Sequence, residues 1–111
     1  MTPSKSQQAQ AIAEIPRQRQ RAAFFADDEA LTRALQAGHP GAPAELFDRY
    51  GSHIQAVLVN VMGVDQELPD LLHESFAQAF KSVHQLKEGA RLKAWLTRIA
   101  VFTARGCIRR R

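Results

Sequence analysis

The chain has 111 residues, of which 45% are hydrophobic, and a formal net charge of +4. This length suits one domain, and the apolar residues are scattered, whereas a membrane helix needs about 18 consecutive ones. The N-terminal residues also lack the apolar core of a signal peptide, so we expect a soluble, cytoplasmic protein without membrane insertion. The single cysteine, Cys107, excludes an internal disulfide and a cluster of several zinc-binding thiols.

Charge is distributed unevenly along the chain. Residues 27–86 contain three basic and nine acidic residues, whereas residues 87–111 contain eight basic residues and one acidic residue. A basic surface suits a polyanion, and an acidic surface suits a basic region of another protein. The sequence therefore predicts two surfaces with different partners.

The first 26 residues differ in composition from the rest of the chain. They are rich in Gln, Ala and Arg, and Pro3 and Pro16 would interrupt a long helix. We expect residues 1–26 to form a mobile basic arm, because so polar a segment buries too little apolar surface to fold alone. Residues 27–111 are expected to form one helical domain.

Two helices are expected in the first half of this domain. One begins at Asp27 and Asp28, which suit an N-cap and a first helical turn, and it ends at Gly38. The second runs from Pro43 to Gly63 with apolar residues three and four positions apart. Its expected apolar positions are Leu46, Phe47, Tyr50, Ile54, Val57, Leu58 and Val61, and Gly51 is an internal weak point.

Two further helices are expected in the second half. The third begins around residues 67–70 and ends near residue 86, and the fourth spans residues 91–111. On the third, the expected core residues are Leu72, Phe76, Ala79, Phe80 and Val83, and the opposite face carries Asp70, His73, Glu74, Lys81 and His84. The expected buried stripe of the fourth is Leu92, Leu96, Ile99, Ala100 and Thr103. No segment alternates as a strand does, so the predicted fold class is all-α, a compact bundle of about four helices.

The sequence shows no pattern typical of catalysis. The four histidines, at positions 39, 53, 73 and 84, lack the spacing of a helical metal site. There is neither a glycine-rich phosphate loop nor a nucleophile elbow. We therefore expect no enzyme activity, no metal site and no cofactor.

The last expected helix combines arginines with aromatic residues. On a helical wheel, one narrow sector contains Arg91, Arg98, Arg105 and Arg109. Trp95 and Phe102 border this basic ridge and the buried stripe, which suits single-stranded nucleic acid, because its bases stack on aromatic rings and its phosphates need positive charge. Two alternatives remain: Trp95 also fits a core position, and runs of arginine are often only solvated.

Three segments together resemble a known family. These are AELFDRYGSHI (44–54), DLLHESFAQAF (70–80) and RLKAWLTRIAVFTARGCIRRR (91–111). In this order and at this spacing they resemble region 2 of the sigma-70 family of transcription initiation factors, most closely the extracytoplasmic-function (ECF) type. The similarity covers residues 28–111.

The resemblance implies two binding surfaces. It implies that the third helix docks on the clamp helices of the RNA polymerase β′ subunit through Asp70, Leu71, His73, Glu74 and Phe76, with Phe76 mainly as packing. It also implies that residues 86–93, including Leu86, Lys87, Arg91 and Lys93, read the non-template strand of the −10 promoter element. Contacts to that strand are implied for Trp95, Arg98, Phe102, Arg105 and Arg109.

The chain departs from the family pattern on both helices. His73 replaces the usual Gln, Phe102 replaces an Asn, and Gly106 replaces an Asp, so the DNA-facing helix has lost two polar positions. The family's second helical domain, which reads the −35 element, has no counterpart in these residues. Two alternatives follow: a degenerate sigma-like module that binds an anti-sigma factor or another regulator, and a generic basic helical protein that binds nucleic acid non-specifically.

Overall fold

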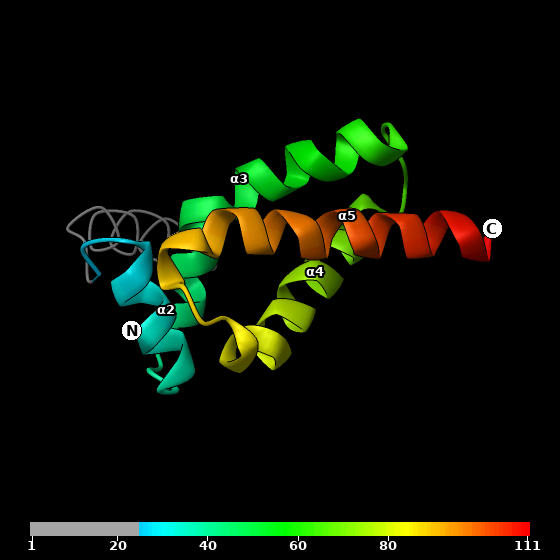
Figure 1. Ribbon diagram of the computed structural model, residues 1–111. Helices are drawn as coiled ribbons and strands as arrows, with labels where there is room; N and C mark the ends of the chain where they lie inside the picture. The colour runs from blue at the N-terminus through cyan, green and yellow to red at the C-terminus, as the bar shows by residue number, and fades with distance from the viewer. Residues whose placement is uncertain (1–24) are drawn as a thin grey trace, which may run out of the picture.

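The computed structural model describes residues 25–111. This part of the chain contains the helices α2 (Asp28–Gln36), α3 (Ala42–Met62), α4 (Leu68–Ser82) and α5 (Leu92–Arg110), with the short 3-10 helices η1 (Val83–Gln85) and η2 (Gly89–Arg91) before α5. No strand occurs in the described residues, and the predicted all-α fold is confirmed (Figure 1). Residues 1–24 of the predicted basic arm lie outside the described residues.

The helix boundaries follow local sequence signals. The Asp27 side chain accepts a hydrogen bond from the Ala30 amide at 2.8 Å and caps α2. Proline lies in the first turn of both α3 and α4, where its missing amide hydrogen costs nothing. Gly63 ends α3 with φ of 77°, a conformation that other residues adopt only with strain.

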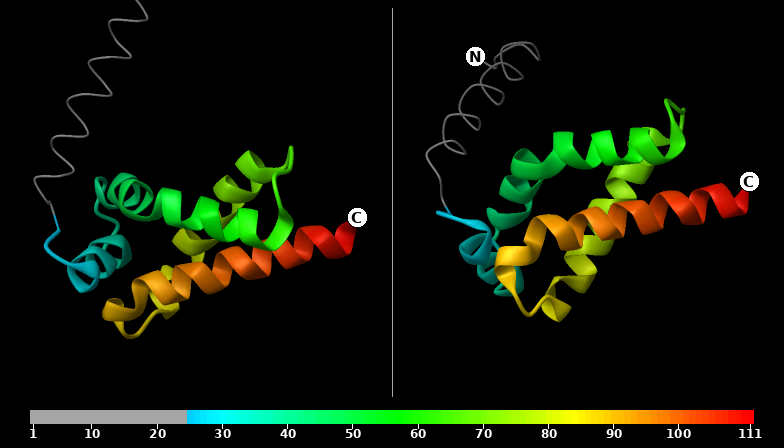
Figure 2. Two further views of the ribbon diagram at one scale, coloured as in Figure 1. Left: turned by 90° about the horizontal axis from the view of Figure 1, so that it is seen from above. Right: turned by 45° about the horizontal axis from the view of Figure 1, so that its top comes forward.

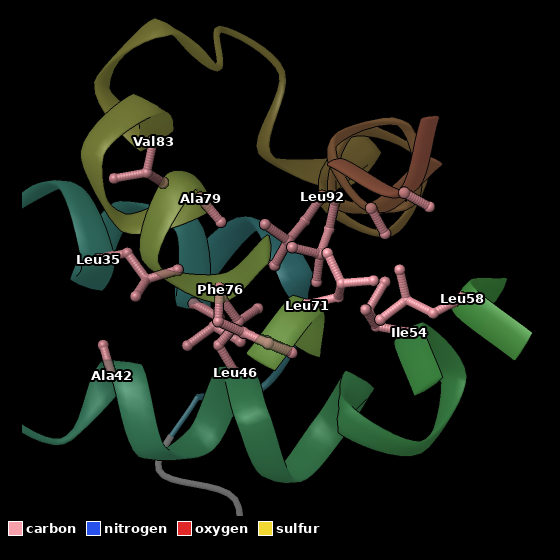
Figure 3. Close-up of a cluster of buried hydrophobic side chains, with 14 of the residues drawn as sticks. Leu35, Ala42, Leu46, Ile54, Leu58, Leu71, Phe76, Ala79, Val83 and Leu92 are labelled. Carbon is pink, nitrogen blue, oxygen red and sulfur yellow. The ribbon is translucent and has the colours of Figure 1, made fainter. Parts of the chain in front are cut away.

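Helix α5 packs against both α3 and α4, and α2 lies at the end where α5 begins (Figures 1 and 2). Apolar side chains from these helices meet in one core (Figure 3). Its fully buried members include Leu31, Leu46, Ile54, Leu58, Leu92, Leu96, Ala100 and Ala104. Burying a leucine side chain stabilises the fold by about 1.5–3 kcal/mol. The buried leucines of α5 therefore fix its position against the other helices.

The buried face of α4 differs from the prediction. Leu71 is 2% exposed and Ser75 is fully buried, whereas Phe80 is 37% exposed. The predicted face is wrong in this respect because α4 packs against α5 as well as α3, which turns its buried sector toward Leu71 and Ser75. The Ser75 hydroxyl donates to the Leu71 carbonyl at 2.8 Å, so its burial leaves no unpaired group.

One expectation for α3 is also corrected. Phe47 is 45% exposed, and its ring lies 5.0 Å from that of Phe76 at the edge of the core. Gly51 does not interrupt the helix. It is buried, and a Cβ atom there would lie 3.4 Å from the Phe47 ring. The small residue thus leaves room for the Phe47 ring.

The buried face of α5 includes residues that helical periodicity did not predict. Ala104 and Cys107 are buried, whereas Ile99 and Thr103 are half-buried. The prediction of a buried Thr103 is therefore wrong. Thr103 lies at the side of the helix next to α4, where its hydroxyl donates to the Ile99 carbonyl at 2.9 Å.

Helix α2 is attached to α3 by a polar network around Asp28. The Asp28 carboxylate accepts hydrogen bonds from Arg49, at 3.0 Å, and from the Tyr50 hydroxyl. Arg49 also pairs with Glu45 at 3.1 Å. Burial of the phenol, followed by its hydrogen bond to Asp28, raises the pKa of Tyr50 to about 12.

Substituting Asp28 should lower this pKa. Tyr50 is the only tyrosine of the chain, so phenolate absorbance in a pH titration reports it directly. In Asp28→Asn we expect the pKa of Tyr50 to fall from about 12 toward, but not to, its ordinary value of about 10, because the burial remains. Asp27→Asn, which keeps an N-cap side chain, should leave it unchanged.

The sign of the pH dependence follows from the raised pKa. The stability that this hydrogen bond contributes is present below pH 10 and is lost as the pH rises toward about 12. An unaltered Tyr50 titration in Asp28→Asn would contradict the network.

Candidate functional site

A groove of about 630 Å³ runs between α4 and α5. Two residues of α4 form one side, and residues of α5 spaced three or four apart form the other. The lining residues are Glu74, Gln78, Trp95, Arg98, Ile99, Phe102, Thr103, Gly106, Arg109 and Arg110. The packing of α5 on α4 therefore leaves a concave surface that contains much of the predicted nucleic-acid face.

Aromatic rings line the α5 side of this groove. Phe102 is 72% exposed, and the guanidinium carbon of Arg109 lies 5.9 Å from the centre of its ring. Trp95 is half-buried: it packs against the core and also lines the groove, so the core and surface interpretations of this residue both hold in part. The attraction between a cation and an exposed ring is weak. Arg109 covers one face of the Phe102 ring and leaves the other face to a partner.

The groove is rich in positive charge. Arg98, Arg109 and Arg110 line it together with one acidic residue, Glu74. None of these three arginines forms a salt bridge with an acidic side chain of residues 25–111. Their charge is available to an anion, and the combination of arginines with aromatic rings suits a single strand of nucleic acid.

The acidic face of α4 lies beside the groove. Asp70, His73 and Glu74 are exposed on α4, as the sequence predicted, and Glu74 belongs to both surfaces. Leu71 and Phe76 are 2% and 3% exposed. Phe76 acts as packing, as expected, but Leu71 is a core residue, so the inference that it meets a partner is corrected.

The loop predicted to read the DNA strand, residues 86–93, leads into the beginning of α5. Lys87 and Lys93 are exposed, and Leu86 is half-buried against the core. Arg91 lies in η2 rather than in α5, and its Nε atom pairs with Glu88 Oε2 at 2.9 Å.

The predicted arginine ridge is therefore not continuous. The heptad spacing that placed Arg91 with the other arginines assumed one helix, and the 3-10 geometry of η2 breaks that phase. Arg105 is exposed but does not line the groove.

Comparison with known proteins gives the family of this chain. The family model of sigma-70 region 2 matches residues 46–111, which is more than half of the chain. The chain belongs to the sigma-70 region 2 family. The resemblance inferred from the three sequence segments is thereby confirmed.

The similar curated proteins are ECF sigma factors. The chain is 32% identical over 78 residues to the ECF RNA polymerase sigma-E factor of Haemophilus influenzae, an alignment that covers 70% of the chain and 41% of that protein. It is 33% identical over 78 residues to the protein of that name from Salmonella typhimurium, covering 70% and 40%. This sigma-70 region 2 domain thus spans about two fifths of the length of these relatives. No solved structure matches the chain.

Polar contacts fasten the far end of α5 to the loop between α3 and α4. The Cys107 thiol donates to Glu67 Oε2 at 2.6 Å, and Arg111 pairs with Asp65. The hydrogen bond to Glu67, and then burial, raise the pKa of Cys107, while the Glu67 amide and then Arg111 lower the pKa of Asp65. These contacts hold the last turn of α5, from which Arg109 and Arg110 line the groove.

Sequence reasoning missed part of the groove. Gln78, Ile99, Thr103, Gly106 and Arg110 line it but were not among the predicted site residues. Gln78 lies one helical turn after Glu74, and the others follow Trp95 and Phe102 at four-residue steps, so helical spacing from the predicted residues would have found them.

Two features are absent from residues 25–111. No group of three or more His, Cys, Asp or Glu side chains there could hold a metal ion. Within the same residues, no helix is long and apolar enough to cross a membrane.

The groove predicts a contrast between two apolar residues of α5. Phe102→Ala should change the free energy of unfolding by less than about 0.5 kcal/mol, because the ring is mostly exposed. Leu96→Ala removes a fully buried side chain and should cost about 2–5 kcal/mol. Urea unfolding followed by circular dichroism measures both. A loss for Phe102→Ala as large as that for Leu96→Ala would show that Phe102 is a packing residue.

Proposed function

We propose that this sigma-70 region 2 domain binds the clamp helices of the RNA polymerase β′ subunit through α4 and the non-template strand of a −10 promoter element through α5 and the preceding loop. The observation that carries the proposal is the groove next to the acidic face of α4, in which the exposed Phe102 ring lies among arginines that form no salt bridge within residues 25–111. Membership of the family supports a role in transcription initiation. The particular surfaces are our inference.

The polymerase contact would rest on the exposed side chains of α4. Asp70 and Glu74 are one helical turn apart on the surface, with His73 between them, so they present negative charge to one partner helix. The clamp helices that sigma-70 factors bind are basic, and charge-assisted hydrogen bonds to arginine fix orientation as well as affinity. Such an exposed interface weakens as salt rises.

The DNA contact would rest on stacking and phosphate binding. A base stacked on an aromatic ring contributes about 1–3 kcal/mol, and the groove arginines can neutralise phosphates of the same strand. Taking a base out of the duplex costs a few kcal/mol. Binding to Trp95, Phe102 and the neighbouring arginines would offset that cost and favour the separated strands.

Charge reversal on α4 separates the two contacts. We expect Asp70→Arg and Glu74→Arg each to weaken binding of the full chain to RNA polymerase core enzyme by about tenfold, because each would repel basic helices. Asp70 lies outside the groove, whereas Glu74 lines it. Asp70→Arg should therefore leave the affinity for single-stranded DNA unchanged, whereas Glu74→Arg should raise it.

Fluorescence anisotropy of labelled chain measures polymerase binding, and anisotropy of labelled oligonucleotide measures DNA binding. Glu88→Arg, which changes an exposed acid outside α4, is the matched control for polymerase binding. Equal polymerase affinity for wild type and both α4 variants would contradict the proposed α4 contact.

Two substitutions on α5 distinguish stacking from charge. Phe102→Ala should lower the affinity for single-stranded DNA by about 1–3 kcal/mol and leave the salt dependence unchanged. Arg98→Gln should reduce the slope of log affinity against log salt by about 0.7, the effect of one phosphate contact on a single strand. Trp95 is the only tryptophan and lines the groove, so quenching of its fluorescence reports the bound strand.

The control for the salt experiment is Arg33→Gln, a substitution of an exposed arginine on α2, which should leave the slope unchanged. If Phe102→Ala binds as tightly as wild type, the ring is not a stacking platform. If Arg98→Gln has the wild-type slope, Arg98 does not contact phosphate.

A second candidate function is a sigma-like interaction module that binds an anti-sigma factor or another regulator without reading a promoter. Phe102 and Gly106 favour it, because they line the groove where the family pattern has Asn and Asp. This alternative predicts normal binding to polymerase or to the regulator and equal affinity for all single-stranded sequences.

A further inference from the structure

The loop that leads from α4 to α5 is attached to α2. The Gln36 side-chain amide donates two hydrogen bonds to this loop, one to the Val83 carbonyl at 2.9 Å and one to the Leu86 carbonyl at 2.8 Å. The Val83 carbonyl also accepts the Leu86 amide at 3.1 Å, which closes η1. One side chain of α2 therefore holds both ends of the turn from which the loop starts.

The loop touches α2 a second time at Gly89. A Cβ atom on Gly89 would lie 2.9 Å from the Glu29 Cα and 3.1 Å from the Thr32 Cβ, so no side chain fits there without moving the backbone. The buried Thr32 hydroxyl lies 2.8 Å from the Asp28 carbonyl and 3.3 Å from the Gly89 carbonyl. The backbone of the loop thus lies directly on α2, beside the start of α5 (Figure 1).

These two contacts leave a short exposed segment between them. Lys87 and Glu88, which lie between the Leu86 and Gly89 attachment points, are exposed. Because α2 is itself attached to α3 through Asp28, the segment is held relative to the core. A loop fixed before binding loses less conformational entropy when a ligand arrives.

We propose that Gln36 and Gly89 are positioning residues that set the sequence preference of this loop for single-stranded DNA without contacting the DNA. The proposal rests on the proposed function, in which the loop reads the strand. Both hydrogen bonds of Gln36 go to backbone carbonyls of the loop, so they fix the path of the backbone whatever side chains the loop carries. The exposed side chains between the two contacts then meet the bases in one arrangement.

The test begins with a sequence preference of the full 111-residue chain. A random pool of single-stranded oligonucleotides, sequenced after binding, identifies the preferred sequence, and anisotropy gives its affinity relative to a scrambled sequence of the same composition. Gln36→Met keeps the length of the side chain and removes both hydrogen bonds. We expect this affinity ratio to fall by about tenfold, corresponding to the loss of two hydrogen bonds, with little change for the scrambled sequence.

A second variant and a control keep the test decisive. Gly89→Ala should lower the same ratio, because the added methyl group pushes the loop away from α2. Gln66→Met, at an exposed glutamine in the loop between α3 and α4, should keep the wild-type ratio. Amide hydrogen exchange of residues 83–91 should be faster in Gln36→Met and Gly89→Ala than in wild type, while α3 and α5 remain protected.

The outcomes separate this inference from the proposed function. If wild type discriminates between sequences, and both Gln36→Met and Gly89→Ala discriminate equally well, the positioning role is wrong and the proposed function stands. If wild type binds preferred and scrambled sequences equally, promoter reading itself fails and the positioning role fails with it. Loss of discrimination in both variants, with polymerase binding retained, supports the proposal.

Discussion

The burial of one face of α5 between α3 and α4 determines the rest of this structure. Leu92, Leu96, Ala100 and Ala104 are fully buried, and the two alanines let the neighbouring helices approach closely. Because this face is buried, Phe102 and the arginines on the opposite side of α5 are exposed to solvent. The groove between α4 and α5 is therefore a direct consequence of core packing.

The same packing brings opposite charges together. Acidic residues precede basic ones in the chain, and the sequence alone suggested two separate surfaces. In the fold these surfaces meet at Glu74, which is exposed on the acidic face of α4 and also lines the groove beside Arg98. A bound polymerase helix and a bound DNA strand would be neighbours, so the charge of Glu74 would affect binding of both.

Much of the fold could be predicted from local signals. Asp27, Pro43, Gly63 and Pro69 mark helix ends within a residue or two of those observed, because caps and prolines act through nearby backbone groups. The family could be recognised because three segments share its order and spacing. The exposed acidic residues of α4 and the groove position of Phe102 follow from helical periodicity once the helices are known.

The remaining features depend on contacts between distant segments. Helical periodicity predicts the apolar face of α4 but not that α4 has a second neighbouring helix, so the predicted core does not include Leu71 and Ser75. Ser75 was also misleading because its polarity is satisfied by its own helix. Arg91 was assigned to the ridge because the sequence does not show that a 3-10 turn precedes α5. The attachment of Gln36 to the loop joins residues 47 and 50 positions apart, which no local pattern reveals.

In the proposed function, α4 and α5 bind two partners at once. The most direct measurement is the affinity of the full chain for its preferred single-stranded oligonucleotide, by anisotropy, with and without saturating RNA polymerase core enzyme, using a polymerase preparation that binds the oligonucleotide weakly on its own. We expect a ternary complex in which the affinity for DNA is unchanged or higher. Competition, in which polymerase displaces the oligonucleotide from the chain, would contradict it.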